Sequence, residues 1–172
     1  MTDERRLQNL GFELLRVQDE HDPHDGRLVL RDINEGRMLP LAVDFLEPRL
    51  LHRLKHGLSK RQPMARALGF GSAKKAGRPY VIDATAGLGV DSFFMAALGC
   101  RVLAVERSET VAALLEDGLR RLRAAVARGG VEPYEALNGI VERLSLVKGD
   151  AREVLASLDE AECPDIVYLD PM

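Results

Sequence analysis

Residues 83–91 read DATAGLGVD and stand where a short apolar strand leads into a helix. Gly87 and Gly89 allow a sharp turn there, and they let the backbone approach a ligand without an intervening Cβ. The helix that follows presents free N–H groups and the positive end of its dipole. Ligands of open α/β sheets bind at such carboxyl ends of strands. The segment therefore predicts a cofactor site with contacts at Asp83, Ala84, Gly87 and Gly89.

The spacing of this loop differs from a dinucleotide fingerprint, which has a third glycine three residues after the second. Ser92 occupies that position. A carboxylate at Asp83 would be awkward beside a pyrophosphate but suits an amino-acid ammonium group or the water around it. The pattern favours a cofactor with an amino-acid part. The alternative is an ordinary tight turn in which Asp83 caps the following helix.

Carboxylates also follow the next two strands. Glu106 can accept hydrogen bonds from both hydroxyls of a ribose, a feature common to nicotinamide and S-adenosylmethionine sites. Asp150 and Ala151 come after the next strand, where a side-chain or backbone group can reach an adenine amine. The same two residues can begin a helix. These positions are consistent with a nucleoside cofactor lying across the carboxyl ends of the strands.

Asp170 and Pro171 follow the last strand of the chain. A carboxylate held there can accept a hydrogen bond from an exocyclic base amine and align its lone pair with a sulfonium methyl group. Transfer of that methyl group to the amine would be a direct displacement, in which positioning supplies much of the rate. We expect Asp170 and Pro171 to be the catalytic pair, without a covalent intermediate or a metal. The alternative is a turn that ends the strand.

Residues 48–82 form a basic block. The chain has 24 Lys and Arg against 27 Asp and Glu, yet this block contains nine of the basic residues and no acid. A segregated basic block on an acidic protein indicates a polyanionic partner, and we expect RNA held through its phosphates. The alternative is a solvated helix face opposite a leucine stripe. The expected RNA-binding residues are Arg49, His52, Arg53, Lys55, Lys60 and Arg61.

A parallel sheet would bring the acidic residues together. From residue 80, short apolar strands alternate with helices, which predicts an α/β fold. Ser108 is expected to cap the longest helix. We predict a Rossmann-like sheet in strand order 3-2-1-4 with helices on both faces. The expected strands are 80–84, 101–106, 144–148 and 165–169, and the expected helices are 90–98, 109–128 and 151–158.

Residues 1–79 are predicted to form a small α/β appendage, and residues 80–172 the cofactor-binding core. Residues 27–31 alternate like a strand, and residues 34–36 have turn chemistry. Pro40 indicates that the return strand is an edge or bulged strand. The other expected elements of the appendage are a strand at 38–45, helices at 48–58 and 63–68, and a Gly/Lys-rich linker at 69–79.

Composition argues against several other classes. Hydrophobic residues make up 46% of the chain, enough for a folded core. No apolar run reaches the length of a membrane span, and the N-terminus lacks the apolar stretch of a signal peptide. Cys100 and Cys163 are expected to be reduced thiols rather than zinc ligands. We expect a cytoplasmic protein without membrane or metal partners.

The motifs together resemble the bacterial 16S ribosomal RNA guanine-N2 methyltransferase family RsmJ. The resemblance covers most of the chain from about residue 41 onward. It implies a class I methyltransferase fold that uses S-adenosylmethionine and releases S-adenosylhomocysteine. It also implies methyl transfer to a guanine amine of 16S rRNA, free or in the small ribosomal subunit. The matching segments are VDF (43–45), HRLKHG (52–57), VIDATAGLGVDSF (81–93), GCRVLAVER (99–107), VAALLEDGL (111–119) and VYLDPM (167–172).

The resemblance further implies cofactor contacts at Val90, Asp91, Glu106, Arg107, Asp150, Ala151 and Asp170. Val90 stands where the family has an arginine, and Asp150 and Ala151 stand where it has two serines. Contacts through the backbone would survive these changes, whereas contacts through side chains would differ. Family members continue for two to three further strands, so we expect this chain to be truncated at its C-terminus.

Two other functions stay open at this point. One is an NAD(P)-dependent oxidoreductase on the same fold. The absent third glycine, Asp83 and the Asp-Pro-Met end count against it. The other is a non-catalytic RNA-binding or assembly protein derived from the methyltransferase, which the missing C-terminal strands favour.

Overall fold

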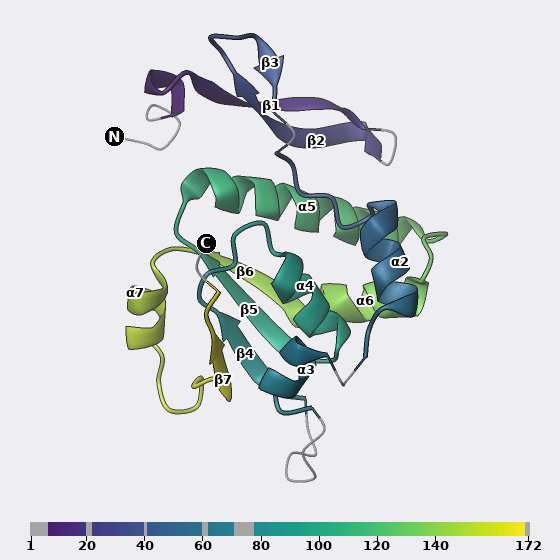
Figure 1. Cartoon of the computed structure of the whole chain (residues 1–172), viewed down its shortest axis with the longest axis vertical. Helices are drawn as coiled ribbons and strands as arrows, with labels where there is room; N and C mark the ends of the chain where they lie inside the picture. The colour runs from purple at the N-terminus through teal and green to yellow at the C-terminus, as the bar shows by residue number, and fades with distance from the viewer. Residues whose placement is uncertain (1–6, 20–21, 40, 60–61, 71–77, 171–172) are drawn as a thin grey trace.

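The computed structural model describes residues 7–19, 22–39, 41–59, 62–70 and 78–170. It contains a three-stranded antiparallel sheet in order β1-β2-β3 and a four-stranded parallel sheet in order β6-β5-β4-β7. The antiparallel sheet lies over one side of the long helix α5, and the parallel sheet lies on the other side of that helix (Figure 1). The α/β fold class and the strand order 3-2-1-4 expected from the sequence are confirmed.

The antiparallel sheet consists of β1 (Phe12–Asp19), β2 (Asp22–Asp32) and β3 (Arg37–Met38). The strand expected at 27–31 lies within β2. The turn expected at 34–36 is also present. Asp32 Oδ1 accepts hydrogen bonds there from the amides of Asn34 and Glu35, at 2.9 and 3.2 Å.

The regular register with β2 covers only Arg37 and Met38 of the strand that begins here. Two further backbone hydrogen bonds follow, from the Leu39 amide to the Leu30 carbonyl at 2.9 Å and from the Leu30 amide to the Leu41 carbonyl at 3.2 Å, so the strand expected at 38–45 is wrong beyond Leu41. Residues 41–44 have no regular structure, and Pro40 lies outside the described residues. The chain leaves the sheet here and crosses to α5, where Val43 and Phe45 are buried at 4% and 1% exposure. Val43 lies so close to Gly118 of α5 that a Cβ on this glycine would be 2.4 Å from Val43 Cγ1. After Leu41, burial of Val43 against α5 and of Phe45 against Phe93 of α4 takes the place of strand pairing.

The parallel sheet consists of β4 (Tyr80–Asp83), β5 (Arg101–Glu106), β6 (Leu144–Lys148) and β7 (Ile166–Tyr168). All four strands occur where the sequence predicts them. β4 is central and pairs with β5 and β7, and β5 pairs with β6. The carboxyl ends of all four strands therefore meet at one edge of the sheet.

The crossovers run through α4 (Val90–Ala97), α5 (Glu109–Arg128), α6 (Tyr134–Arg143) and α7 (Ala151–Ala156). The Ser108 hydroxyl accepts a hydrogen bond from the Val111 amide at 3.4 Å and caps α5 as predicted. Helix α6 was not predicted. It buries Leu137 and Ile140 completely. Right-handed crossovers put α4, α5 and α6 on one face of the sheet and α7 on the other.

Two short helices, α2 (Pro48–His56) and α3 (Pro63–Ala67), precede the parallel sheet. Leu54 of α2 is buried in the same hydrophobic core as the sheet. The Phe45 ring stacks on Phe93 of α4 with centroids 5.0 Å apart. The hydrophobic core therefore includes residues on both sides of residue 79. The division into an appendage at 1–79 and a cofactor-binding core at 80–172 stays a prediction.

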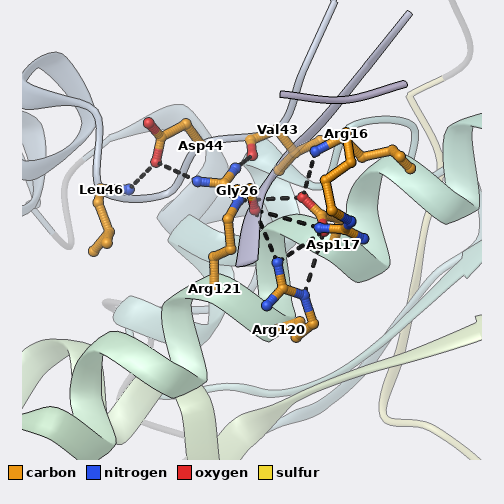
Figure 2. Close-up of polar contacts among 9 residues, drawn as sticks. Arg16, Gly26, Val43, Asp44, Leu46, Asp117, Arg120 and Arg121 are labelled. Carbon is orange, nitrogen blue, oxygen red and sulfur yellow. Dashed lines mark hydrogen bonds and ion pairs between the residues drawn. The ribbon is translucent and has the colours of Figure 1, made fainter. Parts of the chain in front are cut away.

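The antiparallel sheet is joined to α5 through the buried carboxylate of Asp117 (Figure 2). Its Oδ1 accepts a hydrogen bond from Arg16 Nη1 of β1 at 2.8 Å. Its Oδ2 accepts from the Leu28 amide of β2 at 2.9 Å and from Arg121 Nε at 3.2 Å. Arg121 in turn donates to the Val43 carbonyl. One aspartate thus connects two strands, α5 and the crossing segment.

Candidate functional site

The predicted loop follows β4 at the carboxyl edge of the sheet, and its two glycines differ in their surroundings. Gly87 and Gly89 both have positive φ, +54° and +77°. A Cβ on Gly89 would lie 2.4 Å from Leu115 Cδ1, so this position allows α4 and α5 to pack closely. A Cβ on Gly87 would have only the Thr85 carbonyl oxygen nearby, at 4.0 Å. Gly87 therefore leaves open space above the loop.

The Glu106 carboxylate is fixed beside this loop. Its Oε2 accepts a hydrogen bond from the Gly87 amide at 2.9 Å, and its Oε1 accepts from the Ser108 amide at 2.7 Å. Each carboxylate oxygen can accept a further bond. Glu106 is only partly buried, so its remaining capacity is available to a ligand's hydroxyl groups.

Asp83 lies beneath the loop, at 1% exposure. Its Oδ2 accepts a hydrogen bond from the Ser92 hydroxyl at 2.6 Å, and its Oδ1 accepts from the Thr85 amide at 3.2 Å. Burial raises the pKa of Asp83, and the charges of Asp91 and Asp170 raise it further against these hydrogen bonds. Asp83 thus holds the loop to the start of α4. Ser92, which stands where a dinucleotide fingerprint has its third glycine, donates the hydrogen bond to Asp83.

The end of β7 is tied to the same loop. The Tyr168 hydroxyl donates a hydrogen bond to Asp91 Oδ2 at 2.8 Å, and the Asp170 amide donates to Thr85 Oγ1 at 2.9 Å. Burial raises the pKa of Tyr168, and Asp91 raises it further through the hydrogen bond and its charge. Tyr168 therefore stays protonated and donates. Asp91 and the exposed Asp170 are brought to one edge of the sheet.

Sequence reasoning missed Tyr168 and Thr85. The signal for Tyr168 was its position two residues before Asp170, because alternate residues of a strand share a face. Pro171, the other expected catalytic residue, lies outside the described residues.

Asp150 is already engaged where it follows β6. It caps α7 by accepting a hydrogen bond from the Arg152 amide at 2.9 Å, and its Oδ2 pairs with Arg152 Nη2 at 2.6 Å. The hydrogen bonds from Arg152 lower the pKa of Asp150. The Gly149 amide donates to the Glu106 carbonyl at 2.9 Å, so the ends of β5 and β6 are held together. Ala151 begins α7 beside them.

A cavity of about 360 Å³ opens between the ends of β5 and β6, lined by Arg107, Glu109, Lys148 and Gly149. The expected residues Val90 and Arg107 are exposed at this edge of the sheet. In the part of the chain that the structure describes, no group of three His, Cys, Asp or Glu side chains is arranged to hold a metal ion.

Four of the six basic residues expected to bind RNA are on α2. Arg49, His52, Arg53 and Lys55 are all exposed, whereas Lys60 and Arg61 lie outside the described residues. The Arg53 guanidinium lies 3.9 Å from the centre of the Phe94 ring. Arg53 is thus held against α4 by a cation–π contact, and the other three side chains extend from the same exposed helix.

A parallel α/β sheet with an open glycine loop, a fixed carboxylate after β5 and two further aspartates defines a Rossmann-like domain for a nucleoside cofactor. The chain belongs to the family described as putative SAM-dependent methyltransferases, whose model matches residues 8–172. Among the described residues, no helix is both long and apolar enough to span a membrane.

Curated relatives and a solved structure agree with this family. A Shewanella amazonensis protein is 43% identical over 95% of this chain, and a Thioalkalivibrio sulfidiphilus protein is 46% identical over 77%. Both are named ribosomal RNA small subunit methyltransferase J, and the resemblance found in the sequence is confirmed. The crystal structure of a SAM-dependent methyltransferase from Neisseria gonorrhoeae has a TM-score of 0.64 at 35% identity over 94% of this chain.

The chain spans about half the length of these proteins. It covers 58% of the Shewanella relative, 48% of the Thioalkalivibrio relative and 57% of the Neisseria chain.

Proposed function

We propose that this chain contains the cofactor-binding part of a methyltransferase that uses S-adenosylmethionine to modify a guanine N2 amine of 16S rRNA. The family and the names of the relatives support the reaction and the RNA. The observation that supports it best is the Glu106 carboxylate, held by the Gly87 and Ser108 amides next to the open side of Gly87. Neither the family nor the relatives favour the oxidoreductase alternative.

The residues at the carboxyl edge fit S-adenosylmethionine. When bound, this cofactor supplies a methyl group on a positively charged sulfonium. Glu106 has acceptor capacity for ribose hydroxyls, and the loop at Ala84, Gly87 and Gly89 offers open backbone. Asp91 and Asp170 supply negative charge that suits a cationic ligand. The buried Asp83 would contribute by holding the loop in place. Asp150 and Ala151 are proposed to lie near the adenine, and Val90 and Arg107 are proposed as further cofactor contacts.

Asp170 is proposed to hold the acceptor base. Its amide is bound to Thr85 Oγ1, which fixes the backbone at the end of β7, and its carboxylate is exposed. The carboxylate oxygens can accept a hydrogen bond from the guanine amine and direct the nitrogen lone pair away from Asp170. Pro171 would restrict the backbone next to it. Positioning by these two residues accounts for the chemistry without a covalent intermediate.

The exposed basic face of α2 would hold the RNA through its phosphates, with Arg49, His52, Arg53 and Lys55 joined by Lys60 and Arg61. Such contacts position the RNA and do not read its sequence. The substrate would be 16S rRNA, free or in the small ribosomal subunit, so the protein would act in the cytoplasm.

Calorimetry with S-adenosylhomocysteine and NAD on the 172-residue chain tests the cofactor. We expect binding of S-adenosylhomocysteine and none of NAD, and binding of NAD alone would overturn the proposal. Methyl incorporation into small-subunit rRNA then tests the reaction. Cofactor binding without turnover would instead favour the RNA-binding protein derived from such an enzyme.

An Asp170→Ala variant distinguishes methyl transfer from cofactor binding at the site. It should lose methyl transfer and keep most of its affinity for S-adenosylhomocysteine. Asp159→Ala, which changes an exposed aspartate elsewhere, is the matched control and should change neither. An equal loss of both properties in Asp170→Ala would contradict the role assigned to Asp170.

A further inference from the structure

A cavity of about 470 Å³ lies at the opposite end of the parallel sheet, where β5 and β6 begin. Arg101 opens β5 and Glu106 ends it. At about 3.3 Å per residue the two are roughly 17 Å apart. The cavity is thus separate from the candidate cofactor site. Four arginines line it, Arg78, Arg101, Arg123 and Arg143, and we call it the arginine pocket.

Neighbouring groups hold three of these arginines in place without neutralising them. Arg143 Nε donates a hydrogen bond to the Ala96 carbonyl at 3.1 Å, and Arg123 Nη2 donates to the Leu144 carbonyl at 3.3 Å. The Arg101 guanidinium lies 4.4 Å from the centre of the Tyr80 ring. These partners are uncharged, so they orient the guanidinium groups and leave their positive charges in the pocket.

A glycine of α6 makes room for one of the four. A Cβ on Gly139 would lie 2.5 Å from Arg143 Nη2 and 3.0 Å from Nη1, so the guanidinium lies directly against this glycine. Gly139 is in a helix interior, where glycine is less favourable than alanine. Its presence allows Arg143 to reach the pocket.

The pocket arginines lack the close carboxylate partner that several other arginines of the chain have. Arg37, Arg120 and Arg152 each pair with a carboxylate. Within the described ranges, none of the four pocket arginines has a carboxylate partner within 4.0 Å. Glu142 also lines the pocket, where it accepts a hydrogen bond from Asn138 at 3.0 Å. Burial lowers the pKa of Arg143 and the charge of Arg78 lowers it further, whereas the negative charge of Glu142 raises it.

We propose that the arginine pocket binds a phosphate group. Guanidinium groups form paired hydrogen bonds with phosphate oxygens. The residues that line this pocket include four guanidinium groups and one carboxylate, that of Glu142, so positive charge is in excess. An RNA phosphodiester and a free phosphate share this chemistry. The proposal goes beyond the proposed function and does not depend on it, because the pocket lies at the other end of the sheet.

The test uses two probes on each variant. Binding of a short single-stranded RNA is measured over a series of salt concentrations, and binding of inorganic pyrophosphate is measured by calorimetry. The double variant Arg101→Gln/Arg143→Gln removes two pocket charges, and Arg37→Gln is the control on the antiparallel sheet. If RNA is the ligand, the double variant should bind it at least about tenfold more weakly, with a salt slope smaller by about 1.4. If a free phosphate is the ligand, pyrophosphate binding should fall instead.

Gly139→Ala is a second variant that keeps every charge. Its methyl group should displace the Arg143 guanidinium and weaken binding of the same probe. Alanine favours the helix, so this loss would not come from unfolding. Both pocket variants should bind S-adenosylhomocysteine like the unmodified chain, which separates this test from that of the cofactor site. Failure of the unmodified chain to bind either probe, or equal binding by all variants, would overturn the proposal.

Discussion

The Tyr168 hydroxyl donates a 2.8 Å hydrogen bond to Asp91 Oδ2 and so joins β7 to the first turn of α4. A second bond, from the Asp170 amide to Thr85 Oγ1, connects the same two regions. The loop after β4 is therefore shaped partly by the last described strand. Residues that supply the cofactor loop and the residue proposed to hold the acceptor base belong to one hydrogen-bonded unit.

Tyr168→Phe should weaken this unit. Loss of a hydrogen bond to a partly buried carboxylate lowers the free energy of unfolding by about 1–2 kcal/mol. Asp91 would lose its fixed orientation, so affinity for S-adenosylhomocysteine should also fall. Urea denaturation and calorimetry measure the two effects. Tyr134→Phe, at an exposed tyrosine of α6, is the control, and equal behaviour of the two variants would show that the Tyr168 bond has no role.

Substitution by alanine should mainly reduce stability at Gly89 and mainly reduce cofactor affinity at Gly87. Gly89→Ala combines a positive φ with a Cβ only 2.4 Å from Leu115, so it should destabilise the fold by about 2–4 kcal/mol. Gly87→Ala places its methyl group in open space and should cost about 1 kcal/mol through φ alone.

In Gly87→Ala, however, the methyl group occupies the open side of the loop, so S-adenosylhomocysteine should bind at least about tenfold more weakly. Chemical denaturation and calorimetry on both variants check this contrast. Full cofactor affinity in Gly87→Ala would show that the ligand does not approach the loop at this position.

The parts of the fold that local sequence patterns determine were predicted, and those that distant contacts determine were not. Apolar runs bounded by glycine, proline and charged residues predicted β4 to β7 and their order. Helix α6 was missed because Asn138 and Gly139 interrupt its apolar spacing. The burial of Leu137 and Ile140 depends on how α6 packs against α4 and α5. The strand expected at 38–45 fails beyond Leu41 for a similar reason, since Val43 is buried against α5 and Phe45 against α4, both far along the chain.

The same distinction holds for the candidate site. The glycine loop, Glu106 and Asp170 could be found from their positions after strands. The contact between Tyr168 and Asp91 joins residues 77 positions apart, so the position of Tyr168 close to Asp170 could not identify its partner. The burial of Asp83 could not be predicted either, because it depends on how neighbouring elements pack. The cap that Asp150 forms for α7 is a local contact, and the sequence offered it as an alternative.

The pKa of Asp83 predicts a pH dependence of stability. Because burial raises it above the ordinary value of 3.8, the folded state binds more protons than the unfolded state just above that pH. Stability contributed by the protonated form is present below pH 3.8 and declines as the pH rises through the folded-state pKa.

Asp83→Asn should remove this decline. Its Oδ1 can still accept from Thr85, and its Nδ2 can donate to the Ser92 hydroxyl. At pH 7 the variant should be at least as stable as the unmodified chain. Urea denaturation from pH 4 to pH 7 measures the difference, with Asp159→Asn as the control. Parallel stability curves for Asp83→Asn and the unmodified chain would contradict the shift.

Asp117 should have the opposite effect on the pH dependence of stability. Burial opposes its ionisation, but the hydrogen bonds from the Leu28 amide, Arg16 and Arg120 outweigh burial and lower its pKa below 3.8. The stability it provides is therefore present above pH 3.8 and is lost as the pH falls through the lowered folded-state pKa. The antiparallel sheet should separate from α5 at acid pH, because this carboxylate joins the two (Figure 2).

Asp117→Ala leaves the buried Arg121 and the Leu28 amide without this acceptor, so it should destabilise the chain by about 3–5 kcal/mol. Glu116→Ala is the matched control on the next residue. It removes an exposed pair with Lys148 and should cost less than about 1 kcal/mol. Hydrogen exchange should show faster exchange in β1 and β2 of Asp117→Ala while β4 and β5 stay protected. If all four strands exchanged faster by the same factor, Asp117 would support the whole fold rather than the attachment of the antiparallel sheet.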